Sequence, residues 1–274
     1  MNKYAKVSLI LIMCVLFAAC SRKETQPTTF SSIPVPSTTP FPTFPPYQTK
    51  QILVNYWLGG EHDSFDAVLG AKYSKIVLYS DGQVIFRGDP YRQKQLSSDE
   101  INALLSELDN LGFYSIETNQ QHDTTDPLYD FGDQYEKVDD GTYICVKVNN
   151  GRERELCTYE HYKDFLKPPM KKILEFMDNF EPSNLSDYQP DRLLLEIQPL
   201  GAVSENENSK LIAWPVNFPV LPDHWEIMYV EGEIATEVFT FFGNTQDDRR
   251  VTLNGKEYTV YARPLLPHET PMWY

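Results

Sequence analysis

Apolar residues past the first fifty positions fall in short continuous or alternating runs, which is the pattern of β-strands. The clearest case is 75–87, where two such runs flank Asp81-Gly82, a dipeptide preferred in two-residue hairpin turns. That turn sets Leu78 opposite Ile85, so apolar side chains face one another along the hairpin. Further hairpins are expected over 142–158, around Asn149-Asn150-Gly151, and over 251–262, around Asn254-Gly255.

Helical periodicity follows the first two hairpins. Ser97 and Glu100 form a capping box, and apolar residues then recur every three or four positions up to Gly112, a natural helix end. A second helix is expected to begin near Pro168-Pro169 and to direct five apolar side chains inward: Ile173, Leu174, Phe176, Met177 and Phe180. A hairpin followed by a helix thus occurs twice, which predicts an α+β fold of antiparallel hairpins with packed amphipathic helices.

The spacing of apolar residues changes past Pro182, where shorter elements are expected. The pattern predicts strands over 193–197, 211–214 and 225–230, and a short helix over 234–242 that ends at Gly243. We therefore expect an α+β domain over 51–182 and a smaller, β-rich α+β unit over 183–274.

Residues 1–19 predict an export signal. Two lysines precede an apolar run, Val7–Leu16, that is shorter than the roughly 20 residues of a membrane span. The next four residues, Phe17-Ala18-Ala19-Cys20, resemble the lipobox of bacterial lipoproteins, with Phe17 in place of the usual leucine. The resemblance implies cleavage before Cys20 and a diacylglycerol thioether on it. The chain is then exported and anchored to the cell membrane or outer membrane, facing outside the cytoplasm. The alternative is a plain secretory signal with a chance cysteine.

Residues 20–50 are expected to form a lipidated, disordered linker. They are rich in Pro, Ser and Thr, a composition that disfavours helix and sheet and favours extended conformations. A spacer between membrane and body is the simplest interpretation. A proline-rich docking motif and O-glycosylation are the alternatives.

Charge narrows the choice of partners. The chain has 24 basic and 39 acidic residues, and removal of residues 1–19 with their two lysines leaves 22 and 39, a net charge of −17. An acidic surface repels phosphate backbones, so no nucleic-acid partner is expected. The acidic surface would also be repelled by anionic lipids, so we expect membrane attachment to depend on the lipid anchor. A protein or glycan partner is compatible with such a surface.

Two cysteines remain once Cys14 leaves with the signal and Cys20 is lipidated. Cys145 and Cys157 lie on the two strands of one hairpin, in a compartment that permits disulfides. A three-residue loop over 150–152 sets them directly opposite each other, within disulfide reach. A two-residue Asn150-Gly151 turn points them to opposite faces. The sequence is therefore compatible with two alternatives, a disulfide and a pair of buried free thiols.

Candidate chemistry is sparse, because no common catalytic or nucleotide-binding motif is present. The pairs His62-Asp63 and His122-Asp123 are expected in loops, where chance pairing explains them better than a metal site. No metal or cofactor is expected beyond the acyl groups on Cys20. One loop could offer calcium ligands, although its acids also suit an ordinary solvated loop: Asp123, Asp126, Asp130 and Asp133.

Three strings of the body resemble a family of uncharacterised exported bacterial lipoproteins: Leu78–Gly82, Tyr188–Pro190 and Arg263–Pro267. The resemblance implies no activity and supplies no catalytic residues.

The leading hypothesis is a surface-tethered module, without catalytic residues, that binds a partner or supports envelope assembly. The alternative is an extracytoplasmic hydrolase built from dispersed carboxylates and His62 or His122. Trp214, Trp225 and Trp273 suit either a carbohydrate or peptide platform or ordinary packing.

Overall fold

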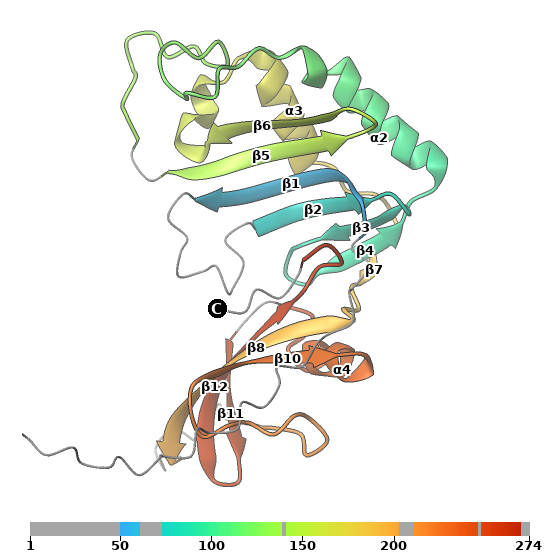
Figure 1. Cartoon of the computed structure of the whole chain (residues 1–274), viewed down its shortest axis with the longest axis vertical. Helices are drawn as coiled ribbons and strands as arrows, with labels where there is room; N and C mark the ends of the chain where they lie inside the picture. Colours follow the sequence, from blue (N-terminus) through green and yellow to red (C-terminus); the bar gives the residue numbers. More distant parts are fainter. Residues whose placement is uncertain (1–49, 61–72, 139–140, 203–210, 246–247, 270–274) are drawn as a thin grey trace, which may run out of the picture. The chain divides into compact units, whose positions relative to one another are not determined.

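The computed structural model describes residues 50–60, 73–138, 141–202, 211–245 and 248–269. The expected signal, Cys20 and residues 21–49 lie outside these ranges. The described chain forms two sheets with helices packed on them, which confirms the α+β class (Figure 1).

The first sheet has seven antiparallel strands in the order β6-β5-β1-β2-β3-β4-β7. They are β1 (Ile52–Gly60), β2 (Tyr73–Tyr79), β3 (Gln83–Phe86), β4 (Arg92–Gln95), β5 (Thr142–Asn149), β6 (Glu153–Tyr159) and β7 (Ser186–Asp187). Strand β4 is entirely polar in sequence and β7 has only two residues, so neither carries the apolar pattern that predicts a strand.

The register predicted for the β2–β3 hairpin is wrong by one residue. Leu78 pairs with Val84 and Val77 with Ile85, across a three-residue connection that ends at Gly82. Gly82 has φ +89°, and a Cβ there would lie 2.7 Å from the Leu96 carbonyl oxygen, so this turn needs glycine. The observed register keeps facing side chains in the same core. The apolar pattern could not reveal it because both faces of the hairpin are apolar.

Two helices cover one face of this sheet, α2 (Ser98–Asn110) and α3 (Pro168–Asp178) (Figure 1). Short 3-10 turns, η1 (Phe113–Ser115) and η2 (Glu160–Phe165), complete this layer. The Ser97/Glu100 capping box is present, and Gly112 follows the helix with φ +85°, as predicted. Side chains from the sheet and the helices form the first core, whose fully buried members include Tyr56, Leu78, Leu108, Val146 and Ile173.

The second sheet has five strands in the order β10-β8-β12-β11-β9, all antiparallel except the β9–β11 pair. They are β8 (Arg192–Ala202), β9 (Ile212–Ala213), β10 (Glu226–Glu231), β11 (Asp248–Leu253) and β12 (Lys256–Pro264). Helix α4 (Glu233–Phe241) packs on one face. The two-residue turn at Asn254-Gly255 is confirmed, because both residues have positive φ and Leu253 pairs with Lys256.

A second core joins residues of both sheets. Val77 and Ile85 of the first sheet cluster with Leu195 and Val260 of the second and with Phe239 of α4. Strand β7 follows residue 182 yet pairs with β4 of the first sheet. The division into 51–182 and 183–274 therefore stays a prediction.

Candidate binding groove

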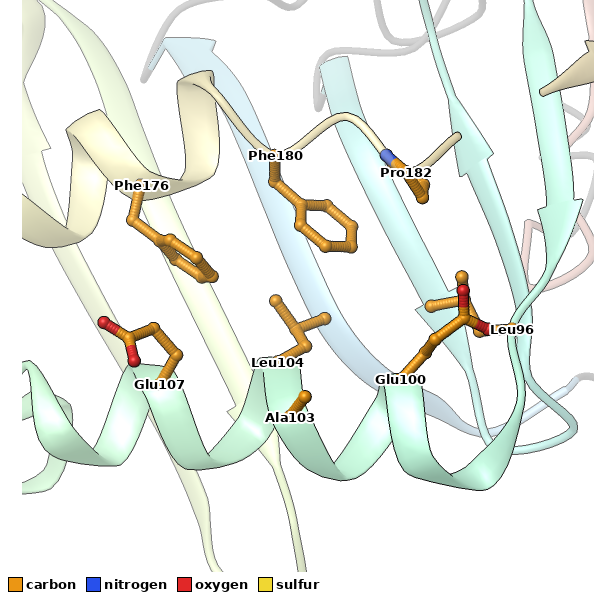
Figure 2. Close-up of a pocket in the computed structure, with 8 residues that line it drawn as sticks. All are labelled: Leu96, Glu100, Ala103, Leu104, Glu107, Phe176, Phe180 and Pro182. Carbon is orange, nitrogen blue, oxygen red and sulfur yellow. The ribbon is translucent and has the colours of Figure 1, made fainter. Parts of the chain in front are cut away.

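A groove of about 390 Å³ runs between α2 and the end of α3 (Figure 2). Helix α2 supplies one wall from a single face, because residues three, four and seven positions apart lie side by side on a helix. The opposite wall comes from α3 and the chain that follows it. The full lining is Leu96, Glu100, Ala103, Leu104, Glu107, Phe176, Phe180 and Pro182.

The middle of the groove is apolar. Leu104 is buried beneath it at 3% exposure, and Leu96, at 4% exposure, lies at the Glu100 end (Figure 2). Phe176 and Phe180 are half-buried, with ring centroids 6.2 Å apart, and their rings point across the groove towards α2 (Figure 2). The sequence predicted that both rings point into the core. Both rings do pack against the first core, but only partly: Phe176 lies at the edge of the buried face of α3, and Phe180 lies past the helix end, where it stacks on Phe86.

The two carboxylates on α2 differ in their surroundings. Glu100 accepts hydrogen bonds from Lys94 Nζ at 2.7 Å and from the Ser97 backbone at 2.8 Å, which lower its pKa to about 2. Glu107 is exposed, and no lysine or arginine within the described ranges pairs with it. The two side chains lie towards opposite ends of the groove, with Leu104 between them (Figure 2). At one end of the groove the charge of Glu100 is thus neutralised by Lys94, whereas at the other end the charge of Glu107 remains available to a ligand.

The lining suits binding better than covalent chemistry. It contains no hydroxyl, thiol, amine or imidazole, and Glu100 is held in its ionised form. The volume lies in the range of ligand pockets, roughly 300–1,000 Å³. The arrangement can accept bulky apolar side chains from another molecule and offer one carboxylate to a nearby cation.

The structure joins Cys145 to Cys157 by a disulfide. The hairpin loop covers residues 150–152, so the three-residue alternative is the observed one and Cys145 faces Cys157 directly. Glu155 lies close to both sulfur atoms and accepts a hydrogen bond from Trp57 Nε1 at 2.9 Å. Disulfide sulfurs are poor metal ligands because metals bind the thiolate form, so this group is structural.

The four carboxylates proposed as calcium ligands do not converge. Asp126 is buried, and its oxygens accept hydrogen bonds from Thr118, from the His122 backbone and from the Leu128 backbone. Asp123 accepts two hydrogen bonds from Thr125, and these lower its pKa. Asp130 and Asp133 are exposed. Within the described ranges these acids form no cluster of three potential ligands. Asp123 and Asp126 instead stabilise their own loop through hydrogen bonds.

The histidines and tryptophans are dispersed. His62 and Trp273 lie outside the described residues. His122 is buried, and its Nδ1 lies 2.9 Å from the Tyr129 hydroxyl, which donates to Thr158. Trp214 is buried in the second core, whereas Trp225 is 58% exposed. His224 is exposed and its Nε2 lies 3.3 Å from a Glu226 carboxylate oxygen, but neither residue lines the α2–α3 groove.

Sequence reasoning missed the groove itself. The helical periodicity predicts that Leu104 is a core residue, which is confirmed, and Glu100 caps the helix as predicted, but neither signal indicates that both also line a groove. One signal was available: Ala103, a small residue, stands beside Leu104 on a face bounded by Glu100 and Glu107. A small side chain next to a buried leucine leaves room above it, but whether that room is filled depends on a distant segment.

Comparison with known proteins gives no further guide. No protein-family model, curated protein or solved structure matches the chain. Among the described residues, no helix has the length and apolar character needed to cross a membrane.

Proposed function

We propose that the chain is an exported, lipid-anchored binding module that holds an apolar segment of a partner protein in the α2–α3 groove. The observation that carries the proposal is the groove, because it combines a buried leucine floor with half-buried aromatic walls. Ligand pockets are typically concave and apolar with a few polar groups at defined positions, and the groove has this character. The anchor would be the diacylglycerol on Cys20, attached through residues 21–50.

Charge favours a partner segment with at least one basic residue. Two leucine-sized side chains buried in the groove would contribute about 3–6 kcal/mol, short of the ~8 kcal/mol of a micromolar complex. A cation beside Glu107 would add to affinity, since no described lysine or arginine occupies that position. The net charge of −17 predicted for the processed chain would also attract a basic partner.

The anchor has a direct test. Cys20→Ala should move the protein out of the membrane fraction or block its processing, and mass spectrometry of the wild-type protein should find diacylglycerol on Cys20. A processed wild-type chain without lipid would overturn the anchoring half of the proposal and leave the groove untouched.

The groove is tested with full-length protein in detergent and an array of short synthetic peptides, in which leucine content and lysine content vary independently. Binding should require both residue types. Ala103→Phe, which places a ring in the groove, should weaken binding at least tenfold. Glu107→Lys should reverse the preference from lysine-containing to glutamate-containing peptides.

Two exposed positions on the same helix provide matched controls, Asn102→Phe and Asp109→Lys, because neither lines the groove. Both should leave the array unchanged. Equal losses in the groove variants and in their controls would show a non-specific surface effect, and peptides that bind without regard to leucine content would contradict the apolar groove.

A further inference from the structure

The five-stranded sheet has one face in the second core and a second face that carries no described helix. Leu195, Ile197 and Val260 point into the second core. Because side chains alternate along a strand, their neighbours Glu196 and Thr259 point to the opposite face. Part of this opposite face is buried, at Leu194 and Arg263. We call the remaining part the open face and define it by six half-buried or exposed residues: Glu196, Gln198, Trp225, Ile227, Thr259 and Tyr261.

The strand register arranges these side chains in rows. Ile227 of β10 pairs with Glu196 of β8, which pairs with Tyr261 of β12. Gln198 pairs with Thr259 in the neighbouring row. Adjacent strands are about 4.8 Å apart, so an amide, a carboxylate and hydroxyl groups follow one another at a spacing comparable to the width of a sugar ring.

Trp225 stands at the start of β10, beside these rows. Its indole Nε1 donates a hydrogen bond to Glu196 Oε1 at 3.0 Å, which fixes the ring against the sheet, yet 58% of the residue is exposed. A tryptophan whose own N–H is satisfied while its ring stays exposed can stack on an apolar surface of a ligand.

Charge identifies the ligand further. Within the described part of the chain, the Glu196 carboxylate accepts only the indole N–H and pairs with no cation. An aromatic face beside a carboxylate attracts a cationic group both through the ring and through the ion pair. A lysine side chain would use these two groups alone, whereas a sugar would also use the amide of Gln198 and the hydroxyl of Thr259.

We propose that the open face binds a glycan that carries free amino groups, with one sugar ring stacked on Trp225 and its ammonium group at Glu196. This site is separate from the groove and takes a different class of ligand. Its function would be to hold the tethered protein on a polysaccharide outside the cell.

The test uses full-length protein in detergent with a glucosamine hexasaccharide and its fully N-acetylated counterpart, measured by calorimetry. The glucosamine hexasaccharide should bind at least tenfold more tightly than the neutral one, and added salt should weaken it. Trp225→Ala should weaken binding of both sugars at least tenfold. Glu196→Gln should weaken only the charged sugar, to about the affinity of the neutral one.

Glu226→Gln removes the same charge from the next position after Trp225, but its cross-strand partner Ile197 points into the second core, so this variant should bind as the wild type does. Unchanged thermal midpoints would show that the variants are folded. The proposal is overturned if neither sugar binds, if Trp225→Ala binds normally, or if the acetylated sugar binds as tightly as the charged one. A lysine hexapeptide that binds through Trp225 and Glu196 when the sugars do not would assign the site to basic polypeptides instead.

Discussion

The two sheets differ in how they cover their faces. The seven-stranded sheet contributes one face to the first core beneath α2 and α3, and part of the other to the second core. The five-stranded sheet has α4 on one face, and no described helix covers the other. The large apolar side chains that are exposed in the described chain all lie in or beside the second sheet: Leu200, Ile212, Val216, Val220 and Trp225. The two proposed binding surfaces therefore differ in origin: one is a gap between helices on the first sheet, and the other is the part of a sheet face that stays exposed on the second.

The difference follows from the amount of helix available to each sheet. α2 and α3 have 13 and 11 residues with several buried positions each, so they cover a wide sheet and leave only the space above Leu104. α4 has 9 residues and can cover one face of a five-stranded sheet. The groove therefore has an apolar middle between Glu100 and Glu107, whereas the open face carries polar groups that water tolerates.

The comparison of the two sheets assumes that both cores are well packed, and it would fail if one core were much less tightly packed than the other. Leu108 in the first core and Leu195 in the second are both fully buried. Leu108→Ala and Leu195→Ala should each lower the free energy of unfolding by about 2–5 kcal/mol, measured by urea denaturation. A loss below about 1 kcal/mol at either site would mean that the corresponding core is poorly packed.

The disulfide adds stability to the first sheet alone. Replacing both Cys145 and Cys157 with alanine should cost about 2–3 kcal/mol, because the bridge closes a short loop. Reductant should lower the stability of the wild type by a similar amount and leave the double variant unchanged. Thiol titration of the denatured, unreduced protein should find neither Cys145 nor Cys157 free, and two free thiols at these positions would contradict the bridge.

The capping box at the start of α2 should stabilise the helix that forms one wall of the groove. Ser97→Ala should cost about 1 kcal/mol, since the Glu100 backbone N–H loses its acceptor. Ser106, which is exposed in the middle of the same helix, is the matched control, and Ser106→Ala should have no cost. Equal effects at the two positions would argue against the cap.

The smallest predicted effect is on the pH dependence of the first sheet. Partial burial would raise the pKa of Asp178, but the hydrogen bond from Tyr56 at 2.6 Å and those from Lys163 and Lys75 hold it below its usual value. A carboxyl with a lowered folded-state pKa stabilises the fold above the unfolded value of about 3.9, and this contribution is lost as pH falls through the folded pKa.

Asp178→Asn should therefore be less stable than the wild type at pH 7, with the difference shrinking in acid. Asp164→Asn, at an exposed aspartate with no hydrogen bond or ion pair from a side chain within the described ranges, should show no such trend. A stability difference that stays constant with pH would contradict the role of Asp178.

Local signals in the sequence predicted much of this fold. The Ser97/Glu100 box and the Asn254-Gly255 turn depend on residues within one turn of each other, so they could be identified directly. The β2–β3 register could not, because apolar residues on both faces fit either alignment. The groove depends on the separation of α2 from Phe180, some 80 residues away in sequence, and the open face depends on which side α4 covers. Neither the separation of these segments nor the side of the sheet that α4 covers can be predicted from a local sequence pattern.

The most direct test of two separate binding surfaces is a crossed measurement on one set of proteins. Wild type, Ala103→Phe and Trp225→Ala are each titrated with a leucine- and lysine-containing peptide and with the glucosamine hexasaccharide. Ala103→Phe should weaken only the peptide, and Trp225→Ala should weaken only the sugar, each at least tenfold. Equal weakening of both ligands by either variant would contradict two independent sites.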